Sequence, residues 1–126
     1  MTKILVVDDE VSILRSTELL LMDMGFDVVT TSDHTSVVEL ARREKPDLLL
    51  QDVRMPGLDL DKLVASLRAE ASLKSLPILL FSASMDLGET AVRVGAEGVL
   101  DKPFKPNEVL DAVHAALAEA PLGGPA

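Results

Sequence analysis

The segment LLLQDVRMPG at residues 48–57 decides the fold that this sequence predicts. Three leucines and a glutamine lead directly to one acid, Asp52, and a Met-Pro-Gly turn follows. A continuous apolar run of this length, ended by an acid and a turn, is typical of a parallel strand that is buried on both faces. We therefore expect Asp52 at the carboxyl end of a buried strand, at the edge where open α/β sheets bind ligands.

Apolar runs alternate with amphipathic helical stripes along the rest of the chain. The patterns predict strands at residues 4–7, 26–31, 48–52, 77–81 and 99–100, and helices that begin near residues 11, 33, 60, 86 and 106. Five β-α units in succession predict a doubly wound α/β fold, with a five-stranded parallel sheet and five helices on its two faces. The simplest flavodoxin-like strand order is 2-1-3-4-5, which puts the ligand crevice between the first and third strands.

Length and composition limit what the chain can do. The 126 residues fit one domain, predicted over residues 1–119, and the uncharged segment APLGGPA at 120–126 is expected to be a flexible tail or the start of a linker. The net charge of -9 argues against direct binding of nucleic acid. The sequence has no apolar segment long enough for a membrane span and no cysteine, which suits a cytoplasmic protein.

Acids and other polar residues follow the predicted strands at the edge that holds Asp52. Asp8 and Asp9 follow the first strand, and Ser82 and Lys102 follow the fourth and fifth. Three carboxylates in one crevice repel one another, and a hard cation such as Mg²⁺, or Mn²⁺, removes the conflict because it prefers oxygen ligands. An aspartate beside a metal ion, a lysine and a hydroxyl is also a competent acceptor for a phosphoryl group.

The motifs ILVVDDE, LLLQDVRMPG, FSAS and LDKPF together resemble the receiver domain of two-component response regulators, from residue 3 to about residue 119. The resemblance implies a regulatory domain whose only chemistry is phosphotransfer to itself and autodephosphorylation. Such a domain accepts a phosphoryl group from a sensor histidine kinase or a phosphotransfer protein. It then passes a conformational change to an output domain or a partner protein, as a monomer or as a dimer that depends on phosphorylation.

The resemblance also implies roles for individual residues. They are Asp52 as phosphoacceptor; Asp9, Asp52 and the Arg54 backbone carbonyl as Mg²⁺ ligands; Asp8 as holder of a metal-bound water; Ser82, Ala83 and Lys102 as phosphate-binding and switch residues; a cis peptide bond before Pro103; and Val99 on the output face. Many family members have Tyr or Phe where this chain has Val99, and an apolar residue where it has Gln51. Because valine is short and stiff, we expect phosphorylation to act mainly by shifting the backbone of residues 84–89.

Other interpretations of these residues stay open at this point. The acids after the first strand could simply start a helix, and Arg54 and Ser84 could either tune water access to Asp52 or be ordinary loop residues. His34 and His114 have no ligand spacing and are expected at the surface.

Two other functions compete with the phosphorylation switch. A haloacid-dehalogenase-like phosphatase also uses a strand-end Asp with Mg²⁺, although it needs Asp-x-Asp. A binding module of this fold that is never phosphorylated is the other alternative. A nucleotide-binding protein is excluded because no glycine-rich loop follows the first strand.

Overall fold

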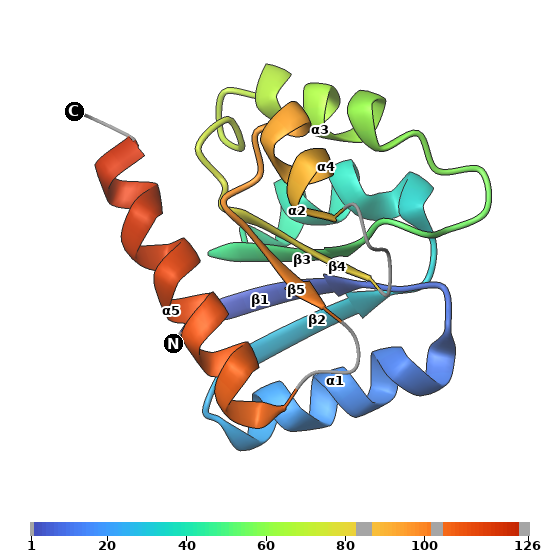
Figure 1. Ribbon diagram of the computed structural model, residues 1–126. Coiled ribbons are helices and arrows are strands. Elements are labelled where there is room, and N and C mark those ends of the chain that lie inside the picture. Colours follow the sequence, from blue (N-terminus) through green and yellow to red (C-terminus); the bar gives the residue numbers. More distant parts are fainter. Residues whose placement is uncertain (1, 83–86, 102–104, 124–126) are drawn as a thin grey trace.

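A computed structural model of the chain describes residues 2–82, 87–101 and 105–123 (Figure 1). Strands and helices alternate along it, as the sequence predicts. In chain order they are β1 (Lys3–Val7), α1 (Val11–Asp23), β2 (Asp27–Thr31), the 3-10 helix η1 (His34–Ser36), α2 (Val37–Glu44), β3 (Leu48–Asp52), α3 (Leu60–Ala69), β4 (Ile78–Ser82), α4 (Leu87–Val94), β5 (Gly98–Asp101) and α5 (Pro106–Gly123).

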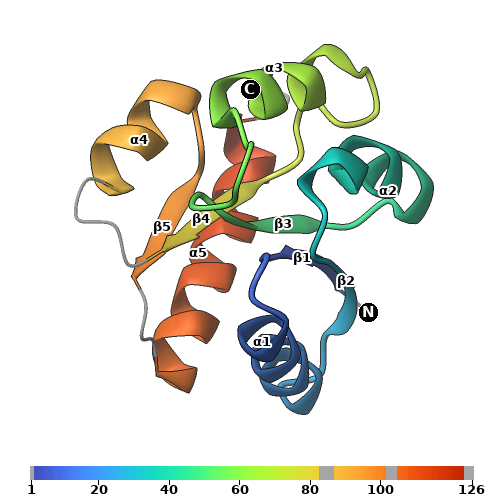
Figure 2. The same ribbon diagram turned by 90° about the vertical axis from the view of Figure 1, so that its right-hand side faces the viewer.

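The five strands form one parallel sheet in the order β2-β1-β3-β4-β5, which confirms the predicted fold class. Helices cover both faces: α1 and α5 lie on one face, and α2, α3 and α4 lie on the other (Figures 1 and 2). A separate apolar cluster fills the space between the sheet and each helical layer. All five residues of the central strand β3 are buried, as expected for a strand that packs on both faces.

Strand register brings the ends of β3 and β4 together. Asp52, the last residue of β3, pairs with Phe81, so Ser82 lies one residue farther along the neighbouring strand. Ser82 in turn pairs with Asp101, the last residue of β5. The polar residues predicted to follow the strands are thus brought to one edge of the sheet, as far as the structure describes them.

Two helices differ from the sequence prediction at their ends. The helix predicted from residue 33 begins with the 3-10 turn η1, because the Asp33 side chain accepts hydrogen bonds from the backbone amide and the hydroxyl of Thr35 and tightens the chain there. The last helix continues to Gly123, so the predicted tail is helical over its first residues.

Arg68, near the end of α3, connects loops at the edge of the sheet opposite Asp52. Its guanidinium donates to the carbonyl oxygens of Lys74 and Leu76, at 3.2 and 2.6 Å. It also lies 3.3 Å from the Glu97 carboxylate, which accepts a 2.6 Å hydrogen bond from the backbone amide of Ile78. One side chain therefore holds the start of β4 and the start of β5 in register.

We expect Arg68→Ala to lower the free energy of unfolding by about 1 kcal/mol, because several partly shielded hydrogen bonds are lost together. Urea denaturation followed by circular dichroism measures the change. Arg43→Ala is the matched control. Arg43 is more exposed, and within the described part of the chain its ion pair is with its sequence neighbour Glu44, so its removal should leave stability almost unchanged. Equal stabilities of the two variants would contradict the role given to Arg68.

Candidate functional site

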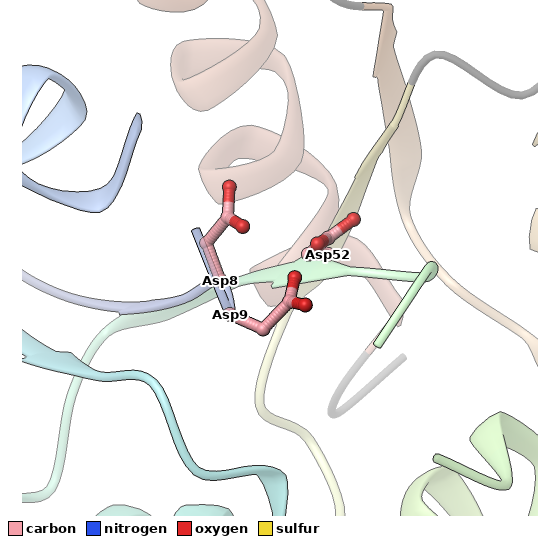
Figure 3. Close-up of side chains that lie close together, drawn as sticks. All are labelled: Asp8, Asp9 and Asp52. Atoms are coloured by element: carbon pink, nitrogen blue, oxygen red, sulfur yellow. The ribbon is translucent and has the colours of Figure 1, made fainter. Parts of the chain in front are cut away.

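Three carboxylates meet at the carboxyl ends of β1 and β3. Asp8 and Asp9 directly follow β1, Asp52 ends β3, and Figure 3 shows the three side chains pointing into one space. One carboxylate oxygen from each residue lies within 4.8 Å of the corresponding oxygens of the other two. Asp8 and Asp52 are buried, whereas Asp9 is exposed, so the cluster is open to solvent on one side.

Backbone amides hold the two buried carboxylates in place. The amide of Glu10 donates to Asp8 Oδ1 at 2.9 Å, where the chain turns into α1. The amide of Arg54 donates to Asp52 Oδ1 at 3.1 Å, where the chain leaves β3. In both cases the acid bonds to the residue two positions later, which fixes the orientation of the side chain through the turn that it belongs to.

The donor set of this cluster fits a hard divalent cation. It offers oxygen atoms only, from three residues of the same charge, and one of them faces solvent. Such a set suits Mg²⁺, which accepts a few carboxylates and keeps several waters, better than zinc, which prefers nitrogen and sulfur. A cation would also offset the mutual repulsion of the carboxylates, most of all at the two buried positions.

The loop after β3 is supported by His34, for which the sequence predicts no role. His34 Nε2 lies 3.1 Å from the carbonyl oxygen of Pro56, so η1 is joined to the turn that follows Asp52. Gly57 continues this turn with φ at +77°, and a side chain at this position would come within 3.5 Å of His34 Nε2. His34, predicted to be an isolated surface residue, is therefore half-buried and in contact with the loop.

Asp33 fixes the segment that carries His34. The hydroxyl and the backbone amide of Thr35 both donate to Asp33 Oδ1, at 2.6 and 2.9 Å. These hydrogen bonds lower the pKa of Asp33 below its ordinary value, and the bond from the Thr35 hydroxyl has the largest effect. Asp33 and His34 also line a shallow hollow beside Asp9, together with Ser32, Met55 and Pro56.

The remaining predicted site residues are placed only in part. Ser82 is buried at the end of β4, and Val99 is half-buried on β5 against the apolar cluster under α3 and α4. Arg54 is exposed and lines a second hollow, with Thr90 and Arg93 of α4 among the other residues of its wall. The predictions for Ala83, Ser84, Lys102 and the peptide bond before Pro103 fall outside the described residues.

Comparison with known proteins identifies close relatives over most of the chain. The pattern of the response regulator receiver domain family matches residues 4–114. The alkaline phosphatase synthesis transcriptional regulatory protein PhoP of Bacillus subtilis is 37% identical over 98% of this chain and 51% of its own length. The DNA-binding response regulator MtrA of Mycolicibacterium paratuberculosis is 33% identical over 91% of this chain and 51% of its own length.

A solved structure agrees with these sequence relationships. The chemotaxis protein CheY4 of Vibrio cholerae superposes with a TM-score of 0.83 at 31% identity, and the match covers 92% of this chain and 98% of that protein. The chain spans about half the length of the two sequence relatives named above. Among the described residues, each helix is too short or too polar to cross a membrane.

Proposed function

Because this chain belongs to the family of response regulator receiver domains, we propose that it is a phosphorylation switch with Asp52 as the phosphoacceptor. Receiver domains of this family are regulatory parts of two-component systems. The observation that carries the proposal is the position of Asp52, which is almost fully buried at the end of the central strand beside two further carboxylates. The family match also favours this function over the phosphatase alternative.

In the proposed reaction a carboxylate oxygen of Asp52 attacks the phosphorus atom of the donor. A phosphorus–oxygen bond forms, the bond between phosphorus and the donor's leaving group breaks, and the leaving group keeps the electron pair. The Arg54 amide holds Asp52 Oδ1, which favours attack by the other carboxylate oxygen, Oδ2. No residue of the chain has to change its oxidation state or carry a second covalent intermediate.

We propose that Asp9, Asp52 and the backbone carbonyl of Arg54 bind Mg²⁺, with Mn²⁺ as a substitute, and that Asp8 holds a metal-bound water. When bound, the cation neutralises charge on the carboxylates and on the transferring phosphoryl group. Asp8 is fully buried and accepts a hydrogen bond from the Glu10 amide. Both features suit a residue that keeps a fixed position and orients a water molecule. Asp9 is exposed, so it can bind an ion that arrives from solvent.

Residues at the ends of β4 and β5 are proposed to bind the phosphoryl group and to respond to it with a conformational change. Ser82, with Ala83, would bond to the phosphoryl oxygens, Lys102 would pair with their charge, and Arg54 and Ser84 would control water access. Val99 is proposed to lie on the output face and to keep one rotamer, because a half-buried valine packed on a core cluster has little room to move. The backbone of residues 84–89 would carry the main shift.

The proposed partners are a sensor histidine kinase or a phosphotransfer protein as donor, and an output domain or partner protein as receiver of the signal, in the cytoplasm. The relatives named as transcriptional or DNA-binding regulators are about twice as long as this chain, so their DNA contact is a property of the whole proteins. With a net charge of -9, this chain is not proposed to bind DNA itself. Residues 1–119 are proposed as the receiver unit, as a monomer or a phosphorylation-dependent dimer.

Incubation with Mg²⁺ and acetyl phosphate tests this function directly. We expect the intact mass to rise by one phosphoryl group, and we expect the added group to be lost slowly by hydrolysis, as acyl phosphates are. The same incubation with a chelator in place of Mg²⁺ is the control and should give little product. A chain that gains no phosphoryl group under these conditions, while it remains folded, would contradict the proposed switch.

A further inference from the structure

Gln51 is a polar side chain buried in the core directly before the proposed phosphoacceptor. It lies on β3, is fully buried, and is flanked in the sheet by Val7 of β1 and Leu80 of β4. Leu49, which faces the same side of the strand two residues earlier, is apolar and equally buried. Among the residues that the structure describes, Gln51 Oε1 has no hydrogen-bond partner.

Burial of this amide has a cost that an apolar residue would avoid. A glutamine placed in an apolar layer loses its hydrogen bonds to water, and here only one end of the amide regains them. Core packing alone would therefore favour leucine or methionine at this position. The contacts made by the other end, Nε2, show what the amide does.

Gln51 Nε2 contacts the acceptor residue and the loop behind it. It donates a 2.9 Å hydrogen bond to the backbone carbonyl of Asp52 and lies 3.6 Å from Met55 Sδ. On the other side of the same peptide unit, the Val53 amide donates to the Phe81 carbonyl across a longer distance of 3.4 Å. The peptide plane between Asp52 and Val53 is therefore held from both sides, and the shorter of the two contacts comes from Gln51.

This peptide plane sets the direction of the next amide. Arg54 N–H donates to Asp52 Oδ1 at 3.1 Å, so a rotation of the plane would move this donor relative to the carboxylate. The same rotation would redirect the Arg54 backbone, which is proposed to supply a carbonyl ligand to Mg²⁺. The bonds thus form one chain, from the Gln51 amide through the Asp52 peptide to the Asp52 carboxylate.

We propose that Gln51 is a positioning residue of the phosphoryl-transfer site: its side-chain amide fixes the turn after β3 and thereby the orientation of the Asp52 carboxylate and the Arg54 backbone. The role in phosphoryl transfer rests on the function proposed above. The effect on the turn does not, because it follows from contacts made without metal or phosphate. Removal of the amide should loosen the site while the core stays packed.

The test compares Gln51→Met with Leu49→Met in the full chain. Both changes place methionine at a buried position on the same face of β3, and only the first removes the amide. In the metal-free protein, we expect hydrogen exchange of the Arg54 amide to become about fivefold faster in Gln51→Met, the factor that corresponds to one hydrogen bond of ordinary net strength. The dissociation constant for Mg²⁺, measured by titration, should rise by a similar factor.

Thermal melts separate this role from a general effect on packing. Gln51→Met should melt within a few degrees of the wild type, because the lost hydrogen bond is offset by removal of a poorly paired buried amide. Unchanged Arg54 exchange in Gln51→Met, or the same acceleration in Leu49→Met, would overturn the proposal. If the wild type takes up no phosphoryl group but Arg54 exchange responds as expected, the proposed function fails and the positioning role stands.

Discussion

Asp52→Asn is expected to abolish uptake of the phosphoryl group from acetyl phosphate. The amide that replaces the carboxylate has almost the same shape but is a very poor nucleophile toward phosphorus, so the loss should be complete and not partial. Asp52 is 3% exposed and has lost most of its contact with water, so the fold should tolerate the neutral side chain well. Intact mass spectrometry after incubation with Mg²⁺ and acetyl phosphate measures the effect.

Asp59→Asn is the matched control for this experiment. Asp59 follows the same loop and caps α3, where its side chain accepts a 3.2 Å hydrogen bond from the Lys62 amide. Asparagine caps helices about as well as aspartate, so this variant should fold and should label like the wild type. Labelling of Asp52→Asn at the wild-type level would refute the acceptor, and loss of labelling in both variants would point to damage to the loop.

The acid cluster could be predicted from sequence because it depends on regular structure. Buried parallel strands read as continuous apolar runs, and the residue after each run lies at the same edge of the sheet. Asp8, Asp9 and Asp52 each follow such a run. In the structure, one carboxylate oxygen of each lies within 4.8 Å of those of the other two. The start of α3, predicted near residue 60 and observed at Leu60, is a similar case, since helix starts depend on a local pattern of a few residues.

Several contacts that support the loops at both edges of the sheet could not be predicted, because they join segments that are distant in the sequence. His34 reaches the Pro56 carbonyl, and Arg68 reaches Glu97, across 22 and 29 residues of sequence with no pattern that marks the pair. In the sequence, Gln51 stands out only as a polar residue where related proteins commonly have an apolar one. Its role depends on the direction of one side-chain amide in the folded core. Neither the periodicity of apolar residues nor the spacing of motifs in the sequence indicates this direction.

The charges of the three acids are screened by water to different extents, because the acids differ in burial. Asp8 and Asp52 are held by backbone amides in a region from which water is largely excluded, so repulsion between them is poorly screened. Asp9 is exposed, and its charge is partly screened by solvent. A cation that bridges the cluster therefore relieves more repulsion than it would at an exposed group of acids, and its binding should be visible as stability.

Mg²⁺ is accordingly expected to stabilise the folded chain, and Asp9→Ala is expected to remove this effect. For a dissociation constant of about 1 mM, a metal concentration of about 10 mM adds roughly 1.4 kcal/mol by mass action, because the ion binds the folded state and not the unfolded chain. In a domain of this size, that corresponds to a rise in Tm of about 5 °C. Differential scanning calorimetry with and without Mg²⁺ measures it.

Asp27→Ala separates the site from a general effect of salt on an acidic protein. Asp27 is an exposed acid at the start of β2. In the strand register it lies opposite Lys3 of β1, at the amino end of the sheet and away from the cluster. Its removal changes the net charge by the same amount as Asp9→Ala but leaves the three carboxylates intact, so the rise in Tm with Mg²⁺ should persist. An equal rise in all three proteins, or the same rise when NaCl of matched ionic strength replaces MgCl₂, would show screening of the charge of -9 and not binding at the cluster.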